Sequence, residues 1–369
     1  MVALVLFAAS ASAQDEIYVR VNVIDNVTSL SLKIPGFYEI SDSASGRVLY
    51  RGKNLNTTVT VSNGDILMGS INLAVRKALI KVSDEVVVIN GRLFRGAMEF
   101  IRGDSGKITV VNHIELEDYV KGILYHEVSH YWPYEALKAQ AVVSRSFALY
   151  QREQSKGKDY DLRSDIYSQV YGGKTSERYR TNKAVDLSRG LVLTYNGKIL
   201  PAYFHATCAG HTEDAALLWK TNLPPLKGVV CGYCQDSPHF NWHCDLTKKE
   251  LKDKLVGAGY KLKDFKDILI QGHDPSGRII NLAIVTEHKD IIIPGKDFRY
   301  IIGPNIIRST NFTVKLMDND VVFEGVGWGH GVGMCQWGAY FMSKKGFTYD
   351  KILSFYYPGS KISSVSEIK

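Results

Sequence analysis

One glutamate, Glu127, occupies a position in which a carboxylic acid can donate a proton. Leu116, Val120 and Ile123 recur before it at helical spacing, and the segment 129–133 (SHYWP) interrupts the pattern after it. Glu127 is therefore expected at the C-terminus of a helix, on its apolar face. Desolvation and the negative end of the helix dipole both disfavour a charged carboxylate there, so we expect its pKa to be raised. A carboxyl group that keeps its proton near neutral pH is suited to general acid catalysis.

A second helix is expected from Pro133, because a missing N–H costs nothing in the first turn. Small residues surround most of this helix, which indicates tight packing, and Gln140 and Arg145 are its polar exceptions. A buried arginine needs a partner, and Glu127 is the candidate carboxylate. Arg145 would then hold ionised Glu127 or a substrate carboxylate, and the alternative is a purely structural pair at the helix junction.

Four of the five cysteines fall between residues 208 and 244. Cys208 with His211, and Cys231 with Cys234, form two close pairs about twenty residues apart, a spacing typical of a structural zinc site. Disulfides are the alternative, because thiols outside the cell tend to oxidise. Cys335 lies far away in a glycine-rich stretch, where we expect a small buried residue. The alternative fourth ligands are His205, His239, His243 and Cys244.

The elements that position these groups divide the chain into two parts. Residues 14–112 contain β-branched segments separated by turn pairs such as Asn63-Gly64 and Asn90-Gly91, which predicts a β-rich N-terminal portion. Residues 113–369 hold the helix pair and mixed strands, with a cysteine-rich insertion near 205–244. We therefore expect an α+β protein whose β-rich portion packs on the helix-pair core, with a cleft between the subdomains.

Several polar side chains outside the helix junction are candidates for contacts to a polar substrate. They are Gln169 and Tyr171 in the segment 165–173, His205 and Thr207 at the end of a hairpin that turns at Asn196-Gly197, His330 and Gln336 in the glycine-rich stretch 325–338, and Gln140. For the segment 165–173 the alternative is a hydrogen-bonded loop that supports the helices. The glycine-rich stretch lacks the Lys and Ser/Thr of a P-loop, so we do not interpret it as a phosphate-binding loop.

Residues 1–13 form a short apolar run that ends in a small-residue cleavage pattern. We interpret them as a signal-peptide remnant and expect a secreted protein of the periplasm or cell envelope. This run is too short to cross a membrane, and no transmembrane span is expected later. The net charge of +7 suits an anionic cell wall, and no nucleic-acid-binding motif accompanies it.

Five motifs resemble those of one family. The segment 126–149, HEVSHYWPYEALKAQAVVSRSFAL, resembles the core motif of the stage II sporulation protein D (SpoIID) family. Four further blocks follow in the family's order: DIYSQVYGG, AYFHATCAGHTED, GVGWGHGVGMCQWGAYFM and ILSFYYPGSKI. Together the blocks span about two-thirds of the chain. Ser129 departs from the pattern, because the family usually has proline there.

The resemblance implies a peptidoglycan lytic transglycosylase, a glycan-strand lyase. Such enzymes cut peptide-stripped strands between N-acetylmuramic acid (MurNAc) and N-acetylglucosamine (GlcNAc), leaving 1,6-anhydro ends. The motif assigns the acid and base roles to Glu127, and the chemistry needs no cofactor and no second carboxylate. Trp132, Tyr131 and Trp328 are candidate flat faces for sugar rings, and Arg145 completes the catalytic pair.

Two alternatives to catalysis remain open at this point. Relatives in the family are described as amidase enhancers, so the protein is alternatively a non-catalytic glycan-binding partner of a cell-wall amidase. A secreted scaffold is the third hypothesis and requires Glu127 to be buried and fully paired. Many family members have Ser-Gly-Gly where this chain has Cys208-Ala209-Gly210, so zinc is expected only in some of them.

Overall fold

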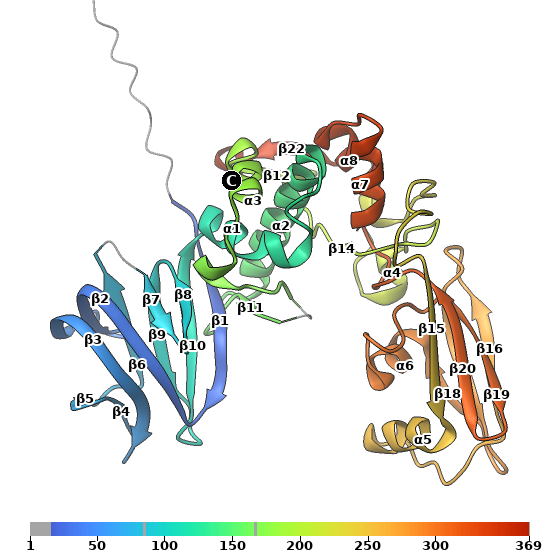
Figure 1. Cartoon of the computed structure of the whole chain (residues 1–369), viewed down its shortest axis with the longest axis horizontal. Coiled ribbons are helices and arrows are strands. Elements are labelled where there is room, and N and C mark those ends of the chain that lie inside the picture. The colour runs from blue at the N-terminus through green and yellow to red at the C-terminus, as the bar shows by residue number, and fades with distance from the viewer. Residues whose placement is uncertain (1–15, 84–85, 166–167, 369) are drawn as a thin grey trace, which may run out of the picture. The chain divides into compact units, whose positions relative to one another are not determined.

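The protein is described from a computed structural model that covers residues 16–83, 86–165 and 168–368 (Figure 1). The predicted signal-peptide remnant, residues 1–13, lies outside these ranges. The fold is mixed α+β, as predicted. The described chain forms two compact units: unit 1 contains residues up to His126, Gln151–Glu177 and the chain from Ser364, and unit 2 contains Glu127–Tyr150 and Arg178–Ser363.

The boundary between the units differs from the division at residue 112 that we expected. Helix α1 (Leu116–Glu127) continues directly from strand β10 (Ile108–Glu115). All residues of this helix except the last, Glu127, belong to unit 1. Gly122 of α1 lies against the ring of Tyr171, and its carbonyl oxygen accepts the N–H of Gly172 at 3.1 Å. Tyr171 and Gly172 therefore pack on α1.

Unit 1 is built on one large sheet, with strand order β11-β1-β10-β9-β6-β2-β3-β4-β5, and with β7 joining β2 to β8. The tight turns at Asn63-Gly64 and Asn90-Gly91 have positive φ at both residues, which confirms the predicted hairpins. The strands are β1 (Tyr18–Val27), β2 (Ser29–Asp42), β3 (Val48–Ser62), β4 (Asp65–Met68), β5 (Ile71–Leu73), β6 (Lys77–Val82), β7 (Val87–Ile89), β8 (Arg92–Phe94), β9 (Ala97–Arg102), β10 and β11 (Leu162–Arg163).

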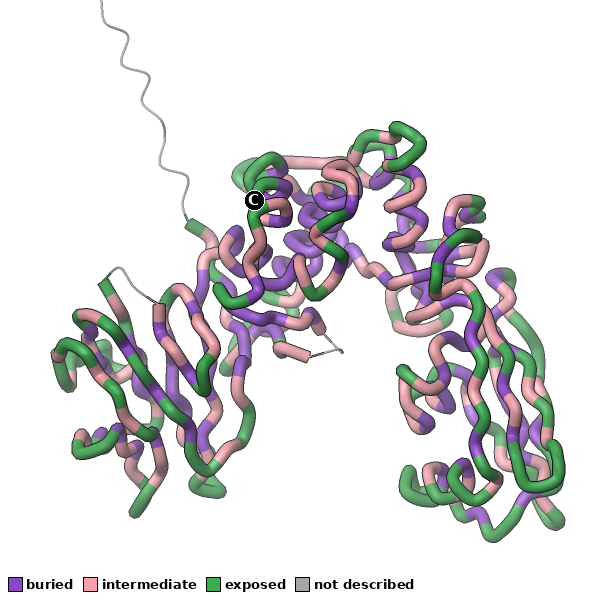
Figure 2. The backbone as a smooth tube through the Cα atoms, viewed as in Figure 1, coloured by how far each residue is buried: buried purple, intermediate pink, exposed green. Residues whose placement is uncertain are grey.

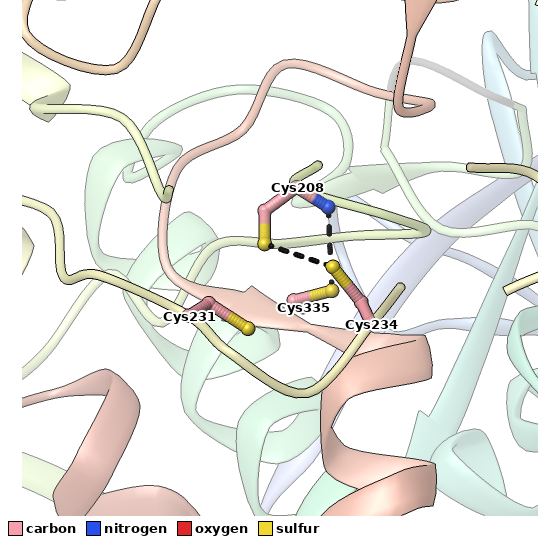
Figure 3. Close-up of side chains that lie close together, drawn as sticks. All are labelled: Cys208, Cys231, Cys234 and Cys335. Carbon is pink, nitrogen blue, oxygen red and sulfur yellow. Dashed lines mark hydrogen bonds between the residues drawn. The ribbon is translucent and has the colours of Figure 1, made fainter. Parts of the chain in front are cut away.

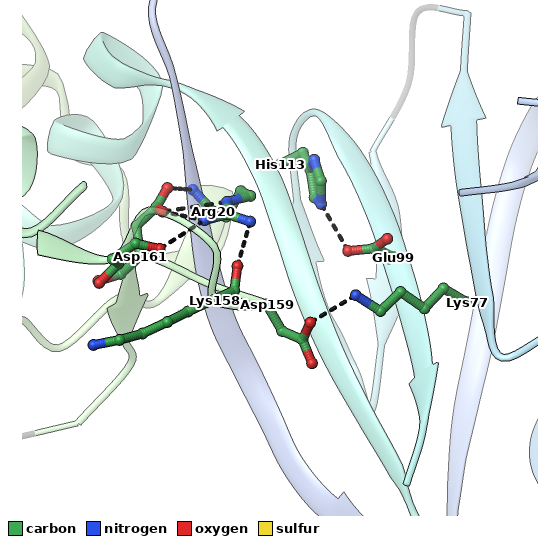
Figure 4. Close-up of polar contacts among 8 residues, drawn as sticks. Arg20, Lys77, Glu99, His113, Lys158, Asp159 and Asp161 are labelled. Atoms are coloured by element: carbon green, nitrogen blue, oxygen red, sulfur yellow. Dashed lines mark hydrogen bonds and ion pairs between the residues drawn. The ribbon is translucent and has the colours of Figure 1, made fainter. Parts of the chain in front are cut away.

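Ion pairs attach the segment after the second helix to this sheet (Figure 4). Arg20 of β1 meets Asp161 at 2.6 Å, and Lys77 of β6 meets Asp159 at 2.6 Å. Arg20 also donates to the carbonyl oxygen of Lys158 at 2.7 Å. These contacts explain why the segment belongs to unit 1.

The core of unit 2 surrounds helix α2 (Tyr134–Gln154), which is buried on most of its faces as its small residues predicted (Figure 2). Strands β14 and β21 pair in parallel, and β12 pairs with β13 and β22. The other elements are η1 (Gly173–Ser176) and η3 (Val365–Glu367) in unit 1, and α3 (Tyr179–Leu187), β12 (Leu191–Tyr195), β13 (Lys198–Ile199), β14 (Phe204–His205), α4 (Ala215–Leu218), η2 (Pro224–Leu226), β21 (Met334–Cys335), α7 (Gln336–Lys344), α8 (Tyr349–Tyr356) and β22 (Lys361–Ser364).

Between β14 and β21 the chain forms a module with its own hydrophobic core, which we call the insert. It runs from Asn241 to Val326 and contains the sheets β15-β20-β19 and β16-β17-β18. The chain enters and leaves it side by side, because the N–H of Gly327 donates to the carbonyl oxygen of Phe240 at 2.7 Å. Its elements are β15 (Asn241–Thr247), α5 (Lys248–Gly257), β16 (Asp267–His273), β17 (Ile279–Val285), β18 (Ile291–Pro294), α6 (Gly295–Ile302), β19 (Phe312–Met317) and β20 (Asp320–Val326).

The insert is larger than the insertion near 205–244 that we expected, and most of it follows the cysteine-rich segment. None of the helices within the described ranges combines the length and hydrophobicity of a membrane span.

Candidate active site at the end of helix α1

Helix α1 ends at Glu127, as the sequence predicted, and this residue is half-buried. The last carbonyl groups of a helix have no partner within the helix. Here the side-chain amide of Gln336, at the start of α7, donates to the carbonyl oxygen of Glu127 at 3.2 Å. The backbone of Glu127 is therefore fixed by a side chain from a distant helix.

A chain of amide groups continues from this contact into α2. The Nε2 atom of Gln336 also lies 3.3 Å from Oε1 of Gln140, and Nε2 of Gln140 donates to Oγ of Ser144 at 3.1 Å. Gln140 and Gln336 are both buried. The two residues predicted to bind substrate thus occupy supporting positions, holding the end of α1 to α2 and α7.

Arg145 lies in the middle of α2 and is fully buried. Its Nη1 atom donates to the carbonyl oxygen of Leu191 at 2.8 Å, which joins α2 to the start of β12. The predicted ion pair between Arg145 and Glu127 stays a prediction.

A row of aromatic side chains leads from the entrance of the insert to the junction between α1 and α2. Ring centroids are 4.7 Å apart for Trp328 and His239, 6.1 Å for His239 and Trp337, 5.1 Å for Trp337 and Trp132, and 5.1 Å for Trp132 and Tyr340. All are half-buried except Trp132, which is buried. We call these five residues the aromatic row. Of these five, only Trp132 and Trp328 were proposed from the sequence as faces for sugar rings.

Two further side chains lie near members of the aromatic row, one in space and one in the chain. The guanidinium of Arg308 lies 4.8 Å from the ring centroid of Trp328. Tyr131, next to Trp132 in the chain, exposes 78% of its surface. Aromatic faces with a nearby polar group suit ligands that have both an apolar and a polar side, as sugar rings do.

The two predicted histidines lie together in unit 2, with ring centroids 5.7 Å apart. Nδ1 of His205 donates to the carbonyl oxygen of Val332 at 3.1 Å, and burial lowers the pKa of His205 to about 3. His330 accepts the N–H of Val332 on Nδ1 at 3.1 Å, and burial lowers its pKa well below the usual value. Thr207 is also buried and bonds to Ser237 at 2.8 Å. These residues hold the glycine-rich stretch in place.

The glycine-rich stretch packs against protein instead of forming an open loop. Gly331 and Gly333 both have positive φ, and a side chain at either position would strike a neighbour. The neighbour of Gly331 is the guanidinium of Arg278, and that of Gly333 is the carbonyl oxygen of Tyr203.

Arg278, from the insert, is a site residue that the sequence analysis missed. It is 1% exposed, and its two Nη atoms donate to the carbonyl oxygens of Cys208, at 3.0 Å, and His211, at 3.1 Å. Beside it, Oγ of Ser276 donates to Glu213 at 2.9 Å, and burial raises the pKa of Glu213 to about 7. A lone arginine in a β-rich segment gives no local signal for these contacts.

Gln169 and Tyr171 lie in unit 1, where both are buried. The hydroxyl of Tyr119 donates to Oε1 of Gln169 at 2.9 Å, and that of Tyr171 donates to Oδ1 of Asn112 at 2.8 Å. These polar groups are used inside the core, which favours the alternative of a supporting loop over substrate contacts.

Four cysteines converge on one point in the core of unit 2 (Figure 3). The Sγ atoms of Cys208, Cys231, Cys234 and Cys335 all lie within 4.8 Å of one another, and all four residues are buried. The fourth member is therefore Cys335, and the prediction of His211 as the fourth ligand is corrected. Nδ1 of His211 instead bonds to the carbonyl oxygen of Thr212 at 2.6 Å. The parallel pairing of His205 with Cys335 between β14 and β21 brings Cys335 to the cluster.

The geometry of this cysteine cluster fits zinc. Four thiolates about 2.3 Å from a tetrahedral ion would lie roughly 3.8 Å from one another. The Sγ atoms of Cys208 and Cys234 are 3.4 Å apart, and none of the four cysteines forms a disulfide. The N–H groups of Cys208 and Gly338 each donate to Sγ of Cys335 at 3.3 Å, as donors around a thiolate ligand do.

Comparison with known proteins places these features in a family. Residues 104–195 match the model described as Stage II sporulation protein, and residues 227–333, which enclose the insert, match a domain of unknown function. The stage II sporulation protein D of Bacillus subtilis is 31% identical over 269 residues, covering 69% of this chain and 76% of the relative. The chain belongs to the SpoIID family.

Two further relatives show the range of the similarity. An uncharacterized protein of Brachyspira hyodysenteriae is 34% identical over 353 residues, which cover 95% of this chain and 94% of the relative. A protein of Bacillus subtilis named amidase enhancer is 26% identical over 293 residues, which cover 66% of this chain and 40% of the relative.

Proposed function

We propose that this protein is a secreted lytic transglycosylase that cuts peptide-stripped glycan strands of peptidoglycan between MurNAc and GlcNAc. The observation that carries the proposal is the arrangement at the end of α1. Glu127 is held there by Gln336, and the next residue of α7, Trp337, belongs to the aromatic row. The residue that holds the proton donor is thus the chain neighbour of a flat face for sugar rings.

In the proposed reaction Glu127 acts first as acid and then as base. Its carboxyl proton passes to the glycosidic oxygen, and the bond from that oxygen to C1 of the muramoyl residue breaks. The C6 hydroxyl oxygen of the same residue bonds to C1, and ionised Glu127 takes the hydroxyl proton. The products are a 1,6-anhydro end and a new free hydroxyl, and no water is consumed. Arg145 would hold ionised Glu127 or a substrate carboxylate.

Zinc has a structural role in this proposal. Cys208, Cys231, Cys234 and Cys335 would hold the ion, which supplies a crosslink between distant parts of the chain. Because Cys231 and Cys234 precede the insert and Cys335 follows it, this crosslink would fix both ends of the insert to the core. The chemical step does not use the metal.

The amidase enhancer among the relatives supports a second candidate function. In this alternative the protein binds glycan through the aromatic row and stimulates a cell-wall amidase without cutting the strand itself.

The test compares purified wild type with Glu127→Gln on peptide-stripped glycan strands, and mass spectrometry detects 1,6-anhydro ends. Glutamine keeps the shape but has no transferable proton, so cleavage should fall by roughly a hundredfold or more. Glu153→Gln, on an exposed part of α2, is the control and should cut like wild type. Equal cleavage by Glu127→Gln would place the acid elsewhere. If neither protein cuts but both stimulate an amidase, the enhancer function is correct.

A further inference from the structure

The insert carries a pocket of about 640 Å³ on its β15-β20-β19 sheet, and this volume lies in the usual range for ligand sites. The residues Trp242 and Phe312 pair with Gly325 of the central strand, and their side chains are buried in the core of the insert beneath the sheet. A side chain at position 325 would strike the Trp242 ring, so glycine is required there. The polar residues that line the pocket are Asn241, His243, His273, Asn311, Thr313 and Glu324.

The polar lining indicates the chemistry of a ligand. Asn241 and Asn311 each offer an amide donor and acceptor, Thr313 a hydroxyl, and Glu324 two acceptor oxygens. No lysine or arginine lines the pocket among the described residues, so a phosphate or carboxylate ligand would find no permanently charged cation there. Such a lining suits a neutral ligand with several hydroxyl and amide groups.

The pocket lies close in the chain to Trp328, one end of the aromatic row. The lining residues Asn241 and Val326 are chain neighbours of Phe240 and Gly327. Phe240 and Gly327 form the backbone hydrogen bond at the entrance of the insert. The N–H of Val326 also donates to the carbonyl oxygen of Asn311 at 2.9 Å. Trp328, the first member of the aromatic row, is therefore two residues from the lining of the pocket. The pocket and the aromatic row are therefore adjacent along the chain at the entrance of the insert.

We propose that this pocket binds an N-acetylhexosamine unit of a glycan strand and that the insert thereby extends the glycan site. The inference rests on the proposed function for the identity of the polymer. The neutral GlcNAc units supply the hydroxyl and acetamido groups that the lining matches, whereas the carboxylate of a peptide-stripped muramoyl unit would meet no lysine or arginine there.

The test measures binding of tetra-N-acetylchitotetraose, a neutral GlcNAc oligomer, to the full-length protein. Thr313→Arg fills the pocket from an exposed strand position, and Leu269→Arg is the control, at an exposed strand position of the insert outside the pocket. Calorimetry should give an affinity about tenfold weaker for Thr313→Arg, as expected for loss of hydrogen bonds at one sugar unit. Leu269→Arg should bind like wild type. In NMR spectra, the backbone amide signals of Asn241 and Glu324 should shift on addition of the oligomer.

Two results would overturn the inference. One is unchanged affinity in Thr313→Arg, and the other is signal changes confined to the aromatic row. The cleavage assay separates this inference from the proposed function. If wild type does not cut glycan but the pocket signals shift, the proposed function is wrong and the sugar site stands. If wild type cuts and the pocket signals do not move, the sugar site alone is wrong.

Discussion

Replacing Gln336 with methionine tests whether a remote side chain fixes the end of α1. Methionine keeps the length and approximate volume of glutamine but has no donor. The variant therefore loses the bonds to the carbonyl oxygen of Glu127, at 3.2 Å, and to Oε1 of Gln140, at 3.3 Å. Two acceptors then lack their donor, one of them in a residue that is 1% exposed.

The expected cost follows from these two acceptors. Leaving a buried acceptor unpaired costs roughly 1–3 kcal/mol. Both bonds are long and Glu127 is only half-buried, so we expect a total of about 2–3 kcal/mol. The melting temperature should fall by roughly 4–10 °C for a unit of this size. The rate of glycan cleavage should fall by more than the loss of folded protein explains, because the backbone that carries the Glu127 carboxyl is no longer fixed by Gln336.

The assay is chemical denaturation of Gln336→Met, Gln140→Met and the double variant. The two side chains contact each other, so the double variant should be less destabilised than the sum of the single variants, by about 1 kcal/mol. Gln271→Met, at an exposed position of β16, is the control and should match wild type. Additive effects, or a Gln336→Met variant as stable as wild type, would refute the reasoning.

Three further predictions concern other parts of unit 2. Arg145→Lys should cut glycan more slowly, because lysine cannot reproduce bidentate geometry, and losing the bond to Leu191 should cost about 1 kcal/mol in a denaturation measurement. Metal analysis should give about one zinc per chain, and Cys335→Ser should lower both zinc content and melting temperature; an intact mass with two disulfides and no metal would contradict this. The pKa of Glu213 is raised to about 7 in the folded state, mainly by burial and then by Asp274, so its stabilising contribution is present below its ordinary pKa and is lost as the pH rises through 7. Glu213→Gln stays neutral, and its stability relative to wild type should therefore rise between pH 5 and pH 8, by up to about 3 kcal/mol, in denaturation curves at the two pH values.

The sequence alone determined the local structure that surrounds the site. The Asn-Gly pairs at 63–64, 90–91 and 196–197 predicted tight turns, and all six residues have positive φ. The break at 129–133 separates two helices, with Glu127 as the last residue of the first. Such features were accessible because turn geometry and helix ends depend on side chains only a few residues apart.

The tertiary structure alone decided which distant side chains complete the site. Cys335 joins a cluster whose other members lie more than a hundred residues earlier, Gln336 fixes Glu127 across 209 positions, and Arg278 reaches the carbonyl of Cys208 across 70. His239 and Trp337 entered the aromatic row only through packing. Each contact depends on how separate elements pack, such as the parallel pairing of β14 with β21, and local spacing carries no information about such pairings. Tyr171 shows the same principle, because its position in the chain suggested a substrate contact and the packing around α1 buried it.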